Sequence, residues 1–169
     1  MDNVKNVNLQ VANFAMKCVC SAIDNKDINN KEYKTLVKKM CILIQKNGLV
    51  NTLAFNLSKV DKAHHFEVIK NIISWTNEDY KLTKISEKLY KNDIEFRDVQ
   101  SYYDEKKRKA LTKRNKEIIS EFIKNLTNTS ISGNEGSELS TVEYRLLTKE
   151  MMILFTWMKR FVDGMIEGE

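Results

Sequence analysis

Apolar residues recur at intervals of three and four along most of the chain, which is the spacing of amphipathic helices. The pattern is clearest near the C-terminus, where one face would carry Leu147, Met151, Leu154, Met158, Phe161 and Met165. Ser140 is followed three residues later by Glu143, the form of a capping box, so we expect this helix to begin there. Because other apolar residues cover most of its remaining circumference, the spacing predicts a core helix buried among other helices.

The N-terminal half predicts several shorter helices. A stripe of small residues, from Ala12 to Ala22, indicates a helix over residues 4–24 that another helix can approach closely. Apolar positions predict a second helix over residues 31–47. Gly48 then ends it, because glycine just past a helix end adopts the left-handed conformation at no steric cost. A short third helix resumes at Leu49, and a fourth is expected after Asp61.

The second half predicts a fifth helix through Leu89 and then a long sixth helix, from Asn92 and Glu95 to Leu126. The middle of the sixth helix is rich in Lys and Arg and offers little apolar surface, so we expect it to project into solvent. Residues 127–140 are rich in Ser, Asn and Gly, and they are expected to form a mobile linker. The predicted fold class is all-α: residues 1–169 form a single-domain bundle of six or seven helices with a buried C-terminal helix.

Composition supports a globular protein. The 169 residues include no proline, five glycines, 42% hydrophobic and 30% charged residues. No apolar run approaches the ~20 residues of a membrane span, so no membrane partner is expected. The N-terminus lacks the order of a signal peptide, and the expected location is cytoplasmic. Cys18, Cys20 and Cys41 are therefore interpreted as reduced thiols.

The net charge of +5 is concentrated in one segment. Residues 104–116 contain seven basic and two acidic residues, which accounts for the whole surplus. A concentrated basic patch is typical of a polyanion binder, although a solvated helix face or a biased codon usage would produce the same pattern. The nucleic-acid-binding candidates in this segment are Lys106, Lys107, Arg108, Lys109, Lys113 and Arg114.

Residues that could support catalysis or bind metal are sparse. Cys18 and Cys20, and likewise His64 and His65, would point to different faces of a regular helix, so neither pair is expected to chelate a metal. There is no glycine loop that could hold a phosphate. Glu150, near the apolar face of the core helix, is interpreted as an internal ion pair. We therefore expect no catalytic residue, no metal, no cofactor and no enzymatic activity.

Two segments resemble a known family. One is N-G-L-V-N-T-L-A-F, residues 47–55; the other is Y-R-L-L-T-K-E, residues 144–150, followed by W-M-K-R-F, residues 157–161. Together they are similar to the small-subunit family of the Cmr (type III-B) CRISPR RNA-silencing complex. That family pairs an N-G-L-x-x-x-L-A-F corner with a C-terminal Y-R-x-x-T-x-E … W-x-K-R-F helix.

The resemblance implies a non-catalytic all-α subunit that assembles in several copies as an inner filament. Its partners would be copies of itself, the backbone subunits that hold the guide RNA, the large polymerase-like subunit, and the duplex of target RNA and guide RNA. Cleavage and signalling chemistry would belong to the other subunits. The resemblance makes Arg145, Lys159 and Arg160 the first candidates for phosphate contact, and Lys149 lies in the same motif.

Two alternatives from other classes remain. A free-standing helical regulator of double-stranded DNA would use the Gly48 corner as a helix-turn-helix, with residues 49–59 in the groove. That segment is almost without side chains that read bases. An enzyme built on His64, His65 and a cysteine is the third hypothesis.

Overall fold

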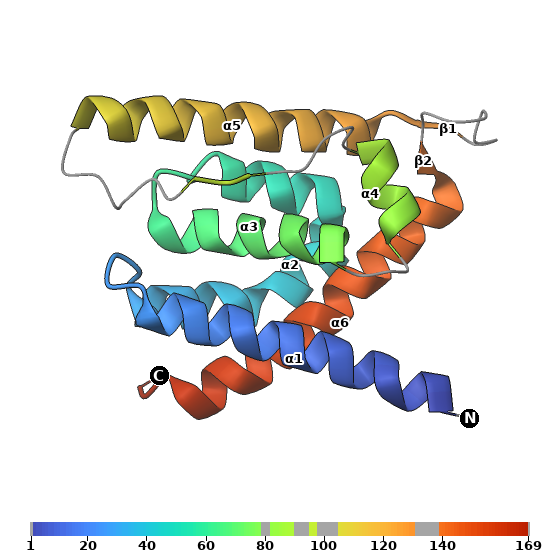
Figure 1. Cartoon of the computed structure of the whole chain (residues 1–169), viewed down its shortest axis with the longest axis horizontal. Helices are drawn as coiled ribbons and strands as arrows, with labels where there is room; N and C mark the ends of the chain where they lie inside the picture. The colour runs from blue at the N-terminus through green and yellow to red at the C-terminus, as the bar shows by residue number, and fades with distance from the viewer. Residues whose placement is uncertain (1, 79–81, 90–94, 98–104, 131–138, 169) are drawn as a thin grey trace.

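Six helices account for most of the chain in the computed structural model, which describes residues 2–78, 82–89, 95–97, 105–130 and 139–168 (Figure 1). They are α1 (Asp2–Asp24), α2 (Asn30–Leu57), α3 (Ala63–Glu78), α4 (Thr83–Leu89), α5 (Glu105–Thr127) and α6 (Thr141–Met165). The β structure of the described residues is limited to a two-residue parallel pair, β1 (Thr129–Ser130) with β2 (Leu139–Ser140). The predicted all-α bundle is confirmed.

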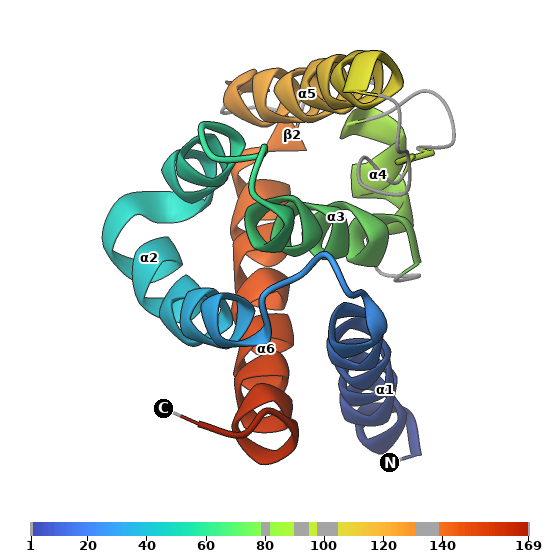
Figure 2. The same ribbon diagram turned by 90° about the vertical axis from the view of Figure 1, so that its left-hand side faces the viewer.

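Helix α6 is the central element of the bundle. It packs against both α1 and α2, and Figure 2 shows it as a column with α2 on one side and α1 on the other. Its start is as predicted: the Ser140 hydroxyl accepts a hydrogen bond from the Glu143 amide at 3.2 Å, and the Ser140 amide donates to Glu143 Oε2 at 2.8 Å. The predicted start of the core helix is therefore confirmed.

The predicted buried face of α6 is correct for Leu147, Met151, Leu154 and Met158, each 0% exposed. It is wrong at the C-terminal end, where Phe161 is only partly buried and Met165 is 41% exposed. Phe155 and Val162 are buried there instead, and Ile166 also packs into the core. The buried face includes these residues because α6 contacts two helices, and a single stripe of four-and-three spacing covers only one contact direction.

Gly48 interrupts α2 as the sequence predicted, and α2 kinks at this residue, with helical segments on either side. Its φ of 79° is positive as expected, whereas its ψ of 164° lies outside the left-handed helical region. Side chains from the next turn satisfy the carbonyls at the kink: Asn51 Nδ2 donates to Asn47 O at 2.9 Å, and Thr52 Oγ1 donates to Gly48 O at 2.8 Å. The kink thus keeps its polar groups paired.

The long sixth helix is predicted to start at Asn92, which lies outside the described residues, but it does not run continuously from Glu95 onward. Glu95–Arg97 are not helical, because Phe96 packs edge-on against Phe66 at 5.8 Å and the Arg97 carbonyl accepts from Asn115 Nδ2 at 2.9 Å. The helix begins at Glu105, so the Lys-rich segment forms its first turns rather than its middle.

Helix α5 runs along one side of the molecule and packs against α2 and α4 (Figure 1). Its second half is anchored by buried Asn115, Ile119, Phe122 and Leu126, while residues 105–110 are exposed as expected. Residues 131–138, most of the segment expected to be a mobile linker, lie outside the described residues. The C-terminal end of this segment packs into the core, since Leu139 is 1% exposed. No described helix combines the length and hydropathy needed to cross a bilayer.

Candidate nucleic-acid interface

Four basic residues of α6 lie along one edge of the helix, here called the α6 edge: Arg145, Lys149, Lys159 and Arg160. All four are exposed. A helix turns about 100° and rises about 1.5 Å per residue, so these positions fall within an arc of about 100° and extend over about 22 Å. The structure therefore brings the four predicted residues of α6 together as one elongated basic edge.

The side chain of Arg160 is positioned by aromatic contacts. Its guanidinium lies over the Trp157 ring, 4.9 Å from the centroid, and Trp157 in turn stacks on Phe161 at 6.0 Å with an interplanar angle of 24°. An arginine that packs flat on an aromatic ring keeps the N–H groups at the edge of its guanidinium free to bind phosphate. Trp157 and Phe161 therefore act as a platform for Arg160.

The beginning of α6 is fixed by an ion pair to α4. Lys88 Nζ donates to both carboxylate oxygens of Glu143 at 2.8 Å. Burial acts to raise the pKa of Glu143, but hydrogen bonds from Lys88 and Ser140 outweigh it and hold this pKa below its ordinary value. Because Glu143 is ionised at neutral pH, the first turn of α6, just before Arg145, is held by charge as well as by its cap.

The cations of the α6 edge have no acidic partners among the residues that the structure describes: no carboxylate lies within 4.0 Å of Arg145, Lys149, Lys159 or Arg160. The nearby acid Asp163 is instead paired with α2, at 3.1 Å from Lys38 Nζ and 3.9 Å from Lys34 Nζ. An edge of unpaired cations on a rigid helix is electrostatically suited to a polyanion.

The other predicted residues form a second surface, here called the α5 face: Lys106, Lys107, Arg108, Lys109, Lys113 and Arg114. All six are exposed. Arg108, Lys109 and Lys113 line a hollow of about 530 Å³ between α5 and the segment around Val60 and Phe66. Two acidic residues, Glu105 and Asp61, also line this hollow, and both are paired: Glu105 Oε1 with Lys109 Nζ at 3.0 Å, and Asp61 Oδ1 with Lys116 Nζ at 3.2 Å.

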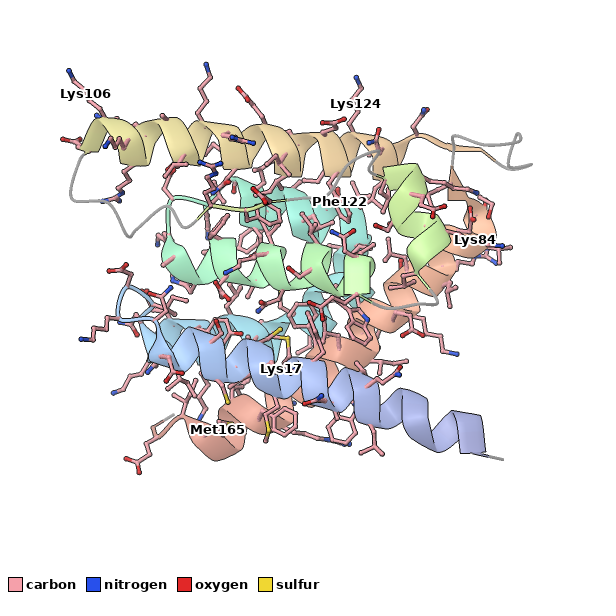
Figure 3. All side chains as sticks on the ribbon, viewed as in Figure 1. Lys17, Lys84, Lys106, Phe122, Lys124 and Met165 are labelled. Atoms are coloured by element: carbon pink, nitrogen blue, oxygen red, sulfur yellow. The ribbon has the colours of Figure 1, made fainter. Side chains whose placement is uncertain are left out.

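The two basic surfaces do not merge. Figure 1 shows that α5 approaches the start of α6 through its C-terminal end, whereas the Lys-rich turns lie at its opposite end. Lys106 points away from the body of the molecule (Figure 3). The α5 face and the α6 edge are therefore separate candidate sites.

The two histidines have an arrangement that the sequence did not indicate. His64 and His65 lie side by side, with ring centroids 4.6 Å apart, so the expectation that they point to different faces is wrong. The rings meet because both residues stand in the first turn of α3, where each is drawn toward a partner on α2: Glu32 for His64 and Asn56 for His65. Burial raises the pKa of Cys18 to about 12, so its thiol stays protonated and is a poor nucleophile. Within the described part of the chain, no three His, Cys, Asp or Glu residues gather as metal ligands.

Two features of possible functional use were missed by the sequence reasoning. The role of Trp157 as a platform for Arg160 could have been suspected from their i, i+3 spacing. Phe55 lies in the last turn of α2 and Lys59 just beyond the end of that helix, and Lys59 Nζ lies 4.3 Å from the Phe55 ring centroid. Their proximity to His65 depends on how α3 packs against α2, which no local pattern specifies.

Comparison with known proteins gives one result. The family model described as CRISPR-associated protein (Cas_Cmr5) matches the chain over residues 7–108 and 98–165. The two matched segments overlap, and together they run from the first turns of α1 to the end of α6. No curated protein matches the chain.

Proposed function

Because the chain belongs to the Cas_Cmr5 family, the small structural subunits of the type III-B CRISPR (Cmr) complex, we propose that it lines the path of the target RNA in that complex. In this proposal the α6 edge contacts the sugar-phosphate backbone of the duplex of target and guide RNA. The chain itself performs no cleavage. The observation that carries the proposal is a row of exposed cations on the central helix of the bundle, none of which has an acidic partner among the described residues.

The composition of the α6 edge suits a protein that must accept many RNA sequences. Arg and Lys bind phosphates whatever the bases, and in RNA-guided systems pairing between the strands reads the sequence while the protein reads shape and charge. Each phosphate that is neutralised releases counterions, so the contribution should depend strongly on salt. A helix anchored along its length by Leu147, Met151, Leu154 and Met158 holds these cations at fixed positions.

The α5 face is the weaker candidate despite its larger charge. Lys109 of this face and the neighbouring Lys116 already have acidic partners. Exposed ion pairs of this kind are worth ~1 kcal/mol or less and can exchange for phosphate, so the α5 face would attract RNA without fixing its position. We assign it a supporting role in the approach of RNA to the complex.

Exposed apolar side chains support contacts with other subunits and with further copies of the chain. They include Leu9 on α1, Met16 on α1, Ile42 on α2, and Val142, Leu146 and Met165 on α6. Large apolar side chains left exposed on a surface are candidates for contacts with other proteins. An inner filament would require such contacts to run head to tail between copies, since a heterologous contact propagates.

The alternative of a free-standing DNA-binding regulator finds little support in the geometry. In the segment that would have to enter the groove, Leu49, Thr52, Leu53 and Asn56 are buried against the rest of the bundle. A recognition helix needs its polar face free for base edges. The family membership points in the same direction.

The proposal is tested by assembling the Cmr complex around variants of this chain and measuring capture of labelled target RNA. Replacing Arg145, Lys159 and Arg160 together by glutamine should weaken capture of every target sequence to a similar degree. A matched variant with Lys17, Lys26 and Lys46 replaced by glutamine removes the same charge from other exposed positions and should capture RNA like the wild type. Equal capture by all three complexes would contradict the proposal.

A further inference from the structure

A hollow of about 370 Å³ lies where the two segments of α2 meet the first turn of α3. The residues that matter for its chemistry are Phe55, His64, His65, Lys31, Lys39 and Lys59. None of them belongs to the α5 face or the α6 edge, and the proposed function makes no use of them. The volume is in the range of sites that hold small ligands.

Phe55 provides an aromatic surface in this hollow. It is 40% exposed, which is unusual for so large an apolar side chain. The His65 ring meets it edge-on, with centroids 5.7 Å apart, and Lys59 Nζ lies 4.3 Å from the ring centroid. The flexible stem of Lys59 allows its ammonium group to move from the ring to a nearby anion.

A buried hydrogen-bond network fixes His65. Asn56 Nδ2 donates to the Thr52 carbonyl at 2.8 Å, so Asn56 Oδ1 is the atom that faces His65 Nδ1, at 2.7 Å. Nδ1 must therefore carry the proton, and Nε2 is left as a hydrogen-bond acceptor. Burial lowers the pKa of His65 to about 4, so the ring is neutral at physiological pH.

The charge around the hollow is positive. Glu32, the carboxylate that lines the hollow, contacts His64, whose Nδ1 lies 3.2 Å from Glu32 Oε2. Across the described ranges, no carboxylate lies within 4.0 Å of the ammonium groups of Lys31, Lys39 or Lys59. A ligand that fits would combine a flat apolar body with a negative group.

We propose that this hollow binds a single nucleotide, with its base stacked on Phe55 and its phosphate among Lys31, Lys39 and Lys59. Aromatic side chains bind bases of any sequence by stacking, and a neighbouring cation binds the phosphate. The unprotonated nitrogen of His65 would accept a hydrogen bond from a base amino or imino group. The nucleotide could be free in solution or be one residue of an RNA strand turned away from its neighbours.

Nuclear magnetic resonance of the isotope-labelled full-length protein tests this. Titration with adenosine monophosphate, and separately with a single-stranded RNA of ten nucleotides containing 2-aminopurine, should shift the amide signals of Phe55, Lys59, His64 and His65. Phe55→Leu keeps an apolar side chain without the ring and should weaken binding about tenfold. Lys39→Gln should weaken it as well, whereas the matched control Lys46→Gln, another exposed position on α2, should not.

The outcomes distinguish a free nucleotide from a nucleotide within an RNA strand, and both from the absence of a nucleotide site. Saturable shifts with adenosine monophosphate indicate a site for a free nucleotide. Shifts with the RNA alone, with 2-aminopurine fluorescence quenched by the wild type but not by Phe55→Leu, indicate a base turned out of a strand. The proposal is overturned if inorganic phosphate produces the same shifts as the nucleotide and Phe55→Leu changes nothing, or if neither ligand shifts these signals. The glutamine variant of Arg145, Lys159 and Arg160 should bind the nucleotide normally, so failure here and failure of the proposed function are distinguishable.

Discussion

The side chain of Lys34 in α2 holds the backbone of Ile166 just after the end of α6. Lys34 Nζ donates to the Ile166 carbonyl at 2.9 Å and to the Gly168 carbonyl at 2.9 Å. The residue is only 8% exposed. The last carbonyls of a helix lack partners within the helix, so a lysine from a neighbouring helix here supplies the cap and ties the C-terminus to the bundle.

Replacing Lys34 by methionine should lower the free energy of unfolding by about 1–3 kcal/mol, because two charge-assisted hydrogen bonds are lost. Lys38→Met is the matched control on the same helix. Lys38 is 43% exposed in its side chain and pairs only with Asp163, so its loss should cost less than ~1 kcal/mol. Urea denaturation measures both, and equal effects of the two variants would show that the contacts to Ile166 and Gly168 do not stabilise the fold.

Gly48 should not tolerate a side chain. Its φ of 79° and ψ of 164° lie in a region that is essentially restricted to glycine. An added Cβ would meet no atom within 4 Å, so the whole cost of Gly48→Ala is backbone strain, about 1–3 kcal/mol. Gly164→Ala is the control: Gly164 lies in α6 without a positive φ and with open space around it. That substitution should stabilise the protein by about 0.5–1 kcal/mol, and thermal unfolding would reveal the opposite signs.

Leu154→Ala tests the role of α6 as the core helix. Leu154 is 0% exposed, and truncating a buried leucine costs about 2–5 kcal/mol through lost burial and the cavity left behind. Leu146→Ala on the same helix, where the side chain is 36% exposed, should cost about 0.5 kcal/mol or less. Similar midpoints for the two variants in a urea titration would contradict the central position of α6.

The buried histidines should make stability fall in mild acid. Burial lowers the pKa of His65 from 6.5 to about 4, and it also lowers the pKa of His64, although Glu32 opposes that shift. The unfolded chain therefore binds more protons than the folded chain between pH 6.5 and pH 4, so the free energy of unfolding falls as pH is lowered through this range. His65→Gln should flatten the dependence more than His64→Gln does. Denaturation at pH 7, 6 and 5 measures this, and an unchanged profile in His65→Gln would contradict the role of its buried neutral ring.

Local patterns predicted much of the fold. The Ser140–Glu143 cap, the interruption of the helix at Gly48 with a positive φ, and the burial of Leu147, Met151, Leu154 and Met158 depend on residues close in sequence, and these were found as predicted. The start of α5 was predicted wrongly, because the pattern at Asn92 and Glu95 resembles a helix cap. What overrides it is the packing of Phe96 against Phe66, a contact between distant residues.

The candidate sites also divide into features that follow from spacing along one helix and features that depend on contacts between helices. The four cations of the α6 edge could be placed on one side of a helix from their spacing alone, and the structure places them there. The contacts of Lys34 with Ile166 and of His65 with Asn56 could not be predicted, since each joins residues of different helices. The hollow beside Phe55 has the same origin, because its walls come from two segments of α2 and from α3.

The salt dependence of target-RNA capture by the assembled complex tests the central claim most directly. For single strands, the logarithm of affinity falls with the logarithm of salt concentration by about 0.7 for each neutralised phosphate. Replacing Arg145, Lys159 and Arg160 by glutamine should therefore make the slope shallower and weaken capture at low salt, nearly regardless of target sequence. The slope should stay at the wild-type value when Lys17, Lys26 and Lys46 are replaced. A wild-type slope in the α6 variant, with a shallower slope when the charges of the α5 face are neutralised, would show that RNA binds through α5 and contradict the assignment.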